Sequence, residues 1–178
     1  MGNEAAKNLI LRELNQKDEL AFLRGYEDWK NEDPNWYSFV WKPGMSHAEH
    51  LQILEAQKDK KTIPENRVPS TMLYGFVGGE IVGRFNIRHE LNSNLFERGG
   101  NIGYSVNPSC RRKGFASQML SQGLDYCKHL SIKKILITCG DQNIASWKLI
   151  EKFGAHLENK TFDANKNEFV RRYWIEIE

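Results

Sequence analysis

The stretch NPSCRRKGFASQML (residues 107–120) decides how this chain is interpreted. A run with strand character ends at Val106, and a run with helix character begins near Gly114. Three consecutive basic residues, Arg111, Arg112 and Lys113, lie between them. Backbone N–H groups at a helix start lack intrahelical partners, and the helix dipole favours an anion there. The pattern predicts a turn that holds a pyrophosphate, with a DNA backbone or a plain basic helix cap as alternatives.

Length and composition limit the class of protein. The 178 residues suit one domain with its own core, so we take residues 1–178 as a single domain. The 25 basic and 23 acidic side chains nearly balance, which argues against a general nucleic-acid coat. The start of the chain carries neither a signal-peptide nor a myristoylation pattern, and no apolar run is long enough to span a membrane. We expect no membrane partner.

The cysteines, Cys110, Cys127 and Cys139, are odd in number and widely spaced, without a CxxC pair. This spacing supports neither a disulfide framework nor a metal site. A reducing cytoplasm is the location that we predict. Cys139 ends a buried strand and has no neighbouring His in sequence, so we expect a small buried residue rather than a nucleophile.

Hydrophobic periodicity predicts the order of strands and helices. Gly78-Gly79 marks the turn of a β-hairpin, Ser46 and Glu49 form a capping-box pattern, and Gly154 ends a helix. The order predicts an α/β (α+β) fold, with a mixed, mostly antiparallel sheet and helices on both faces. The predicted elements are a strand within 8–14, helices at about 18–30 and from 46, strands at 71–77, 80–91 and 99–106, a helix at 114–130, a strand at 133–139, a helix at 143–153 and a hairpin over 157–178.

Neither the P-loop pattern GxxxxGK[ST] nor the dinucleotide pattern GxGxxG is present. Instead, Arg111-x-x-Gly114-x-Ala116 resembles the (Gln/Arg)-x-x-Gly-x-(Gly/Ala) arm of the GNAT acetyltransferase superfamily, which holds the pyrophosphate of acetyl-CoA. The segment NIGYSVNP resembles the family's fourth strand, and NIASWKLIEKFGA (residues 143–155) is similar to the helix after its fifth strand. The resemblance is nearest to the ribosomal-protein-alanine-acetyltransferase-like subgroup.

The resemblance implies an N-acetyltransferase that moves the acetyl group of acetyl-CoA to a primary amine by direct attack in a ternary complex. Residues from about 71 to 178 would bind the cofactor, and those from about 1 to 70 would meet the acceptor. The pantetheine would pair with a free strand edge, and the Val106 N–H would serve the thioester oxygen. The cofactor-binding residues that it implies are Tyr104, Ser105, Val106, Arg111, Arg112, Lys113, Gly114, Phe115, Ala116, Ser117, Asn143 and Ser146.

The proton donor departs from the family pattern. Many members carry a tyrosine four residues after the position of Ser146, and this chain has Ile150 there. Ser146 is the donor that the resembling subgroup suggests. A CoA thiolate, whose thiol pKa is about 8.5, can also leave unprotonated or take its proton from water.

The proton acceptor also departs from the pattern. The family often places a glutamate on the fourth or fifth strand, where this chain has Gly100 or Asn101 and Thr138. Ionisable residues close by in sequence are His89, Glu90, Glu97 and Asp141. His89 and Glu90 point to opposite faces of one strand, so only one can enter a cleft. We favour His89 because neutral imidazole is a competent base near pH 7, against a hydrogen-bonded core histidine and a salt-bridged Glu90 as the plain alternatives.

The segment 26–41 contains six aromatic residues among acidic ones, and in the family this region flanks the acceptor cleft. Acidic and aromatic side chains suit a cationic amine, so we expect a small-molecule or peptide amine as partner. The alternatives are a longer acyl-CoA as donor, or a CoA-binding sensor or interaction domain without chemistry. Nucleic-acid binding is the weakest, because one basic turn neutralises few phosphates. The oligomeric state stays open, a homodimer included.

Overall fold

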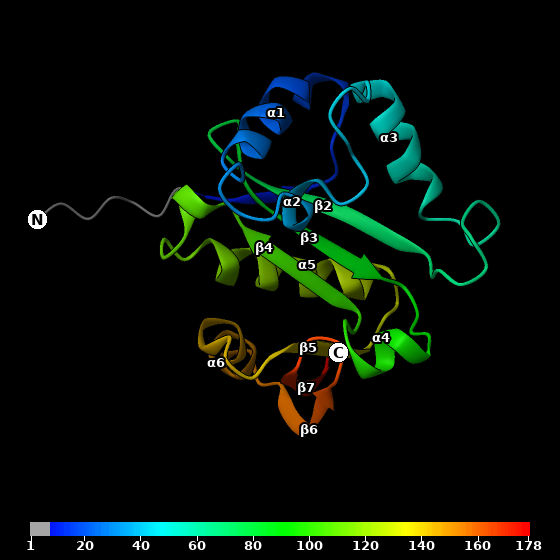
Figure 1. The fold of residues 1–178 in the computed structure, drawn as a ribbon, viewed down its shortest axis with the longest axis vertical. Coiled ribbons are helices and arrows are strands. Elements are labelled where there is room, and N and C mark those ends of the chain that lie inside the picture. Colours follow the sequence, from blue (N-terminus) through cyan, green and yellow to red (C-terminus); the bar gives the residue numbers. More distant parts are fainter. Residues whose placement is uncertain (1–7) are drawn as a thin grey trace, which may run out of the picture.

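The computed structural model describes residues 8–178 (Figure 1). The first seven residues, on which part of the prediction about targeting signals rests, lie outside that range. Seven strands form one sheet in the order β1-β2-β3-β4-β5-β7-β6, and every neighbouring pair is antiparallel except β4 and β5. The strands are β1 (Ile10–Arg12), β2 (Ser70–Val77), β3 (Glu80–Arg88), β4 (Ile102–Val106), β5 (Lys134–Gly140), β6 (His156–Asp163) and β7 (Glu168–Glu176).

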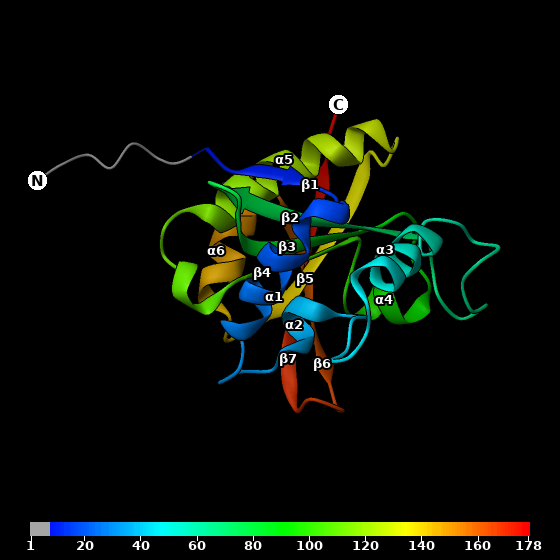
Figure 2. The same ribbon diagram turned by 90° about the horizontal axis from the view of Figure 1, so that it is seen from above.

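Helices cover both faces of the sheet (Figure 2). The α-helices are α1 (Glu19–Glu27), α2 (Asn35–Ser38), α3 (His47–Ala56), α4 (Ser93–Glu97), α5 (Phe115–His129) and α6 (Ile144–Lys152), and the short 3-10 turns are η1 (Gln16–Asp18) and η2 (Pro108–Cys110). The predicted mixed, mostly antiparallel sheet with helices on both faces is confirmed. No helix within residues 8–178 is long and apolar enough to cross a membrane.

The alternation of side chains along β2 and β3 divides the interior into two cores. Leu73, Phe85 and Ile87 point to the side of α5 and join a cluster that also contains Ile150 of α6. Met72 and Tyr74 point the other way and join Phe22 of α1. Because both faces are covered, every residue of β2 is buried. We call these sides of β2–β4 the α5 face and the α1 face.

Glycines form the hairpin turn and the helix end that the sequence predicted at their positions. Gly78 and Gly79 have φ of 59° and 85°, which are the positive values that a tight hairpin turn between β2 and β3 requires. Gly154 has φ of 81° just after α6, so it ends the helix as expected.

Three local features differ from the prediction. The helices α2 and α4 were not predicted, because each is short and follows a segment rich in turn-forming residues. Tertiary contacts support α2: the Tyr37 hydroxyl donates to the Phe22 carbonyl at 3.0 Å. Ser46 does cap α3 by accepting from the Glu49 N–H, but the reciprocal capping box lies at Asn15 and Asp18 instead.

Candidate active site

The sheet opens between β4 and β5. These parallel strands are paired in register at Ile102 and Ile137, and from there they diverge (Figure 1). Asn101 closes the narrow end: its side-chain Oδ1 accepts from the Leu136 N–H at 2.9 Å, and its Nδ2 donates to the Arg88 carbonyl at 3.1 Å. One buried amide therefore fixes the point from which the opening begins.

Beyond Ile102, the edge of β4 that faces the opening has no strand partner among the described residues. The Arg88 N–H donates to the Asn101 carbonyl at 2.7 Å, and the Asn107 N–H donates to the Val82 carbonyl at 2.9 Å. Because bonded residues alternate in an antiparallel pair, the backbone groups of Tyr104 and Val106 face away from β3. An extended ligand with amide groups can therefore pair with this edge as a strand would.

At the wide end of the opening, the basic turn has the backbone of an anion-binding site. Arg112 and Gly114 both adopt the left-handed conformation, with φ of 60° and 80°. Such alternation points successive N–H groups into one concavity, and the N–H groups of Phe115, Ala116 and Ser117 in the first turn of α5 add to it. A side chain added at Gly114 would meet no atom within 4 Å, so the space before the turn is open.

The arginine of the turn has a partner that the sequence did not predict. Arg111 makes two hydrogen bonds, of 2.8 and 2.7 Å, to the Glu32 carboxylate between α1 and α2, 79 residues away in sequence. This pairing lowers the pKa of Glu32. Ser109 is tied to the same segment, since its N–H and hydroxyl both donate to Asp28. Lys113 donates to the Ser109 carbonyl at 3.0 Å. The turn is thus fastened to the segment that follows α1.

Two hydroxyl groups meet beside the opening. The Tyr104 hydroxyl of β4 lies 2.9 Å from the Ser146 hydroxyl in the first turn of α6. Asn143 caps that helix, because its side chain accepts from the Ser146 N–H at 3.2 Å. Burial raises the pKa of Tyr104 to about 12, so the phenol is protonated at neutral pH. The sequence suggested only the backbone of Tyr104 as a functional group, and no local pattern shows where its ring points.

Cys139 belongs to the same surroundings. Burial raises the pKa of its thiol to about 11, and the residue is only 9% exposed. A thiol that stays protonated is a poor nucleophile, which agrees with the small buried role expected for it. Within residues 8–178 there is no group of three His, Cys, Asp or Glu side chains arranged to hold a metal ion.

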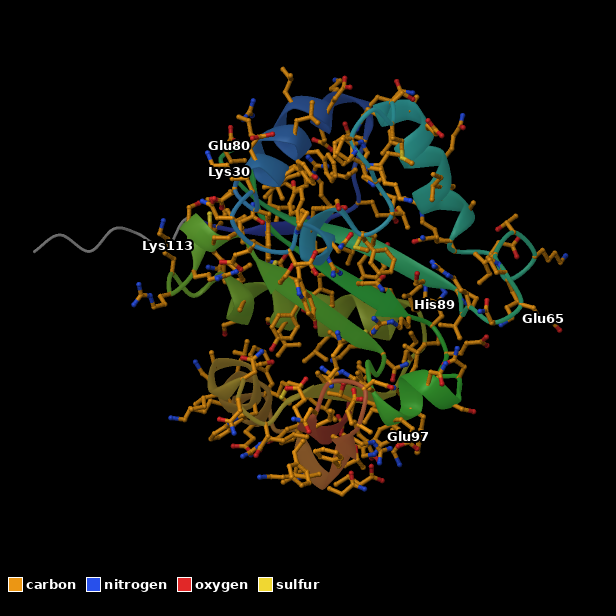
Figure 3. All side chains as sticks on the ribbon, viewed as in Figure 1. Lys30, Glu65, Glu80, His89, Glu97 and Lys113 are labelled. Carbon is orange, nitrogen blue, oxygen red and sulfur yellow. The ribbon has the colours of Figure 1, made fainter. Side chains whose placement is uncertain are left out.

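The strand predicted over 80–91 ends at Arg88, so His89 and Glu90 lie in a bend after β3 rather than on opposite faces of the strand, at the end of β3 far from the basic turn (Figure 3). His89 lies on the α5 face, with its Nε2 2.9 Å from the Thr71 hydroxyl, and burial lowers its pKa. Glu90 is exposed and pairs with Lys60 at 3.0 Å. Figure 3 shows His89 on the opposite side of the molecule from Lys113 of the basic turn. Neither residue makes a hydrogen bond or ion pair with the Tyr104 and Ser146 hydroxyls in the part of the chain that the structure describes.

The other carboxylates named as proton acceptors have different surroundings. Asp141 lies between Lys160 and Arg171, 2.9 and 2.5 Å away, and these cations lower its pKa. Glu97 ends α4 and is exposed.

On the α1 face, two tryptophans of the aromatic segment 26–41, Trp36 and Trp41, have different surroundings. Trp41 is buried, with its ring centroid 5.4 Å from that of Phe22 and 4.9 Å from that of Tyr26, so it is a core residue. Trp36 of α2 is 56% exposed. Its carbonyl accepts from the Ser105 hydroxyl at 2.6 Å, which fastens α2 over β4. Ser105 therefore directs its side chain to the α1 face, away from Tyr104.

The divergence of β4 and β5, with the basic turn at its wide end, is the arrangement that the resemblance to the GNAT superfamily implies. The chain belongs to the Acetyltransferase (GNAT) family, whose family model matches residues 26–155.

A curated relative is the uncharacterized N-acetyltransferase YnaD of Bacillus subtilis (strain 168), which is 32% identical over 79 residues. That match covers 43% of this chain and 46% of YnaD, so the chain spans less than half the length of this relative.

Two solved structures show the same fold. RimL, a ribosomal L7/L12 alpha-N-protein acetyltransferase in complex with coenzyme A, matches with a TM-score of 0.64 at 18% identity and covers 95% of this chain and 94% of its own. A chimera of the spermidine N-acetyltransferase SpeG from Vibrio cholerae and hSSAT matches with a TM-score of 0.60 at 20% identity, over 94% of each chain. At such identities the likeness concerns the fold alone.

Proposed function

We propose that this protein is an N-acetyltransferase that uses acetyl-CoA and transfers the acetyl group to a primary amine by direct attack in a ternary complex. The observation that carries the proposal is the continuous path from the anion-binding turn at Gly114 to the free edge of β4 at Val106 and Tyr104. In this proposal residues 1–178 act as one domain, with the cofactor side at about 71–178 and the acceptor side at about 1–70. Three free thiols fit a cytoplasmic location.

The residues present fit the cofactor chemically. The left-handed Arg112 and Gly114 and the first turn of α5 offer N–H groups to a pyrophosphate, and Arg111 and Lys113 add positive charge. The backbone groups of Tyr104 and the N–H of Val106 suit the amides of a pantetheine arm, whereas the Val106 carbonyl already accepts from the Arg111 Nε at 3.3 Å. When bound, acetyl-CoA supplies the activated thioester. A backbone N–H of this same edge is the donor that we assign to the thioester oxygen.

We assign proton donation to the hydroxyl pair of Tyr104 and Ser146. Because the Tyr104 phenol stays protonated at neutral pH, it can donate to a sulfur that leaves as a thiolate. The Ser146 hydroxyl, 2.9 Å away, orients the phenol and can supply it with a new proton. The pair would fill the role left open by Ile150, where the family often has tyrosine.

We keep His89 as the group that takes the proton from the attacking amine, through water. The lowered pKa of His89 keeps its imidazole neutral at pH 7, the state a base requires. Thr71, whose hydroxyl contacts His89, lies opposite Ile87, and Phe85 lies opposite Tyr104, so His89 and Tyr104 are both on the α5 face. His89 lies far from the basic turn at the wide end of the opening (Figure 3), so in this proposal water molecules carry the proton from the amine to the imidazole.

Two variants test the proton donor. Tyr104→Phe and Ser146→Ala should lower kcat, with Tyr104→Phe giving about a 10²-fold loss, the smaller of the usual contributions of an acid. The dissociation constant for CoA should stay unchanged, because both variants keep the backbone of the edge. Release of free thiol measures turnover, and calorimetry measures CoA binding. Full activity in both variants would show that the thiolate leaves without help from the protein.

The acceptor and donor panels test the function itself. Acetyl-CoA and longer acyl-CoA thioesters are each tested with an N-terminal peptide, spermidine and free amino acids, because two structures of the same fold are named as an alpha-N-protein acetyltransferase and a spermidine N-acetyltransferase. CoA binding without thiol release for any pair would support a sensor domain instead. A chain that binds no CoA would overturn the whole proposal.

A further inference from the structure

Three polar residues at alternate positions of β3, Arg84, Asn86 and Arg88, have their side chains on the α1 face. The register sets Arg84 opposite Ser105 and Asn86 opposite Gly103, and the Arg88 N–H donates to the Asn101 carbonyl at 2.7 Å. Arg84 is 6% exposed and Asn86 is 1% exposed, and Arg88 is half-buried. We call Arg84, Asn86 and Arg88 the polar stripe of β3. Arginine is rarely buried without a charged partner, so two arginines in this stripe require a chemical explanation.

Neither guanidinium group has a counter-ion in the part of the chain that the structure describes. Within residues 8–178, neither Arg84 nor Arg88 belongs to an ion pair, whereas Arg12 and Arg98 each pair with carboxylates. Arg84 donates to the Trp36 carbonyl at 2.5 Å, and Arg88 donates to the Gly99 and Gly100 carbonyls at 3.0 Å. Burial lowers the pKa of Arg84 to about 10 and also lowers that of Arg88. Buried charges without a partner are costly, so an anion that joins them gains free energy.

The same stripe contains polar atoms without hydrogen bonds. The Asn86 Oδ1 atom and the hydroxyl of Tyr74, which lies opposite Arg84, are buried and have no partner among the described residues. Most buried polar atoms are hydrogen-bonded, so unpartnered ones indicate a missing ligand or water. An amide oxygen accepts from an N–H group, and the guanidinium groups donate to an oxyanion. The stripe thus offers hydrogen-bond donors to an oxyanion and a hydrogen-bond acceptor to an N–H group.

The stripe lies beside the opening of the sheet. A Cβ atom at Gly103 would be 3.6 Å from Nη2 of Arg88, so the guanidinium lies directly over the middle of β4. The neighbouring Tyr104 presents its backbone to the opening. Because Gly103 has no side chain, a ligand at the opening can reach Nη2 of Arg88 across it.

Of the acidic residues that favoured a cationic acceptor in the sequence, Glu32 has its charge balanced by Arg111, and Asp28 and Asp33 accept from the neutral residues Ser109 and Asn35. The charged side chains that the polar stripe of β3 places on the α1 face, Arg84 and Arg88, are both cationic. A polyamine approaching them would meet repulsion, whereas an anion would meet attraction.

We propose that Arg88 and Arg84 form an anion subsite for the acceptor, and that the acceptor is an amine that also carries a carboxylate, as a free amino acid does. The carboxylate accepts from the guanidinium groups, and Asn86 Oδ1 accepts from an N–H group of the same molecule. This proposal names the substrate class of the proposed acetyltransferase and rests on that function. The nearby positive charge also favours the neutral form of the amine, which is the form that attacks.

Matched acceptor pairs test the subsite. Phenylalanine is compared with phenethylamine, and lysine with cadaverine, so that each pair differs by the carboxylate. The kcat/KM for the amino acid should exceed that for its decarboxylated amine by at least about tenfold, since a hydrogen bond to a charged group contributes about 1.5–3 kcal/mol. Arg88→Gln should abolish this preference while acetyl-CoA KM stays unchanged. Arg84→Gln also removes the contact that holds α2, so Arg88→Gln is the cleaner variant.

Arg24→Gln is the matched control, because Arg24 pairs with Glu80 on the exposed surface and should leave the preference intact. Equal kcat/KM within each pair, or a preference that survives in Arg88→Gln, would overturn the proposal and leave the arginines a structural role. A second measurement separates failure of the anion subsite from failure of the enzyme function: thermal stabilisation of the protein by phenylalanine and by lysine, without acetyl-CoA. Stabilisation of the wild type but not of Arg88→Gln, with no thiol release for any amine, would support the subsite and overturn the acetyltransferase.

Discussion

The α5 face and the α1 face of β3–β4 are built from the same strands, but we propose that they recognise ligands by different means. On the α5 face and at the basic turn, recognition relies on backbone groups, at Gly114 and along the edge at Val106. On the α1 face it relies on side chains from separate segments, Arg84 and Arg88 of β3 and the exposed Trp36 of α2. Backbone recognition requires a local conformation, which a short motif can specify. Side-chain recognition requires long-range placement, which no short motif specifies.

Replacing Trp36 and Trp41 one at a time should show which of them stabilises the core of the α1 face and which contacts the acceptor. The largest expected effect is the loss of stability in Trp41→Ala. Trp41→Ala should destabilise the fold by about 3–5 kcal/mol, because it removes a buried aromatic side chain. Trp36→Ala should leave stability nearly unchanged and raise the acceptor KM several-fold without changing CoA affinity, since the side chain is exposed. Urea unfolding and steady-state kinetics measure these effects. An unchanged acceptor KM in Trp36→Ala would remove α2 from the acceptor site.

The assignment of the base to the α5 face can be broken by His89→Gln. We expect kcat to fall at least about 10²-fold, with CoA affinity and melting temperature held. Because burial lowers the pKa of His89, the acidic limb of kcat/KM should lie below pH 6.5 in the wild type and disappear in the variant. If Glu90→Gln shows the loss instead, Glu90 and not His89 is the base. Activity in both variants would favour a solvent relay or an amine that arrives neutral.

The backbone site at the turn is tested by Gly114→Val. A β-branched residue at φ of 80° costs about 1–2 kcal/mol, and its side chain would extend into the open space before the turn. The dissociation constant for CoA should rise about tenfold, whereas Arg112→Ala should cost less. Gly44→Val places the same residue at φ of 93° in the loop before α3, and calorimetry should show unchanged CoA binding there. Equal CoA affinity in Gly114→Val and the wild type would exclude the turn as the phosphate site.

A buried histidine on the α1 face predicts acid sensitivity. His50 is 0% exposed, packs 4.7 Å from the Phe22 ring centroid, and burial lowers its pKa from 6.5 to about 4. As pH falls from 6.5 to about 4, the unfolded chain binds a proton that the folded chain does not, so stability decreases by at most about 1.4 kcal/mol per pH unit. His50→Leu should flatten urea midpoints over this window, whereas the exposed His129→Gln should not. An unchanged slope in His50→Leu would show that other groups set the acid sensitivity.

The smallest effect concerns the contact that joins the two sides. Glu32→Gln removes the partner of Arg111 and leaves its guanidinium free for a phosphate, so CoA should bind a few-fold more tightly at low salt. Raising the ionic strength should reduce the difference, because the pair is exposed. Glu80→Gln breaks an exposed arginine pair elsewhere and serves as the control. Identical CoA titrations for Glu32→Gln and the wild type would mean that Arg111 takes no part in cofactor binding.

The sequence by itself determined the features whose cause is local. The glycines at 78 and 79 set a hairpin, Asn143 caps α6, and the spacing of Arg111 and Gly114 indicated the turn, because each depends on the conformation of a few adjacent residues. The hydrophobic periodicity of the strands and helices was enough to predict a mixed sheet with helices on both faces.

Only the tertiary structure decided which distant residues meet. The register of β3 and β4 and the position of α6 bring Tyr104 to Ser146, and the path of the chain after α1 brings Glu32 to Arg111. The helix α2 exists because contacts from Tyr37 and from Arg84 hold a segment that alone would be too short to be stable. Whether Arg84 and Arg88 find carboxylates depends on every element packed against β3, so their lack of a counter-ion could not be read from sequence. Packing brings together groups that are far apart in the chain, and no local pattern records that outcome.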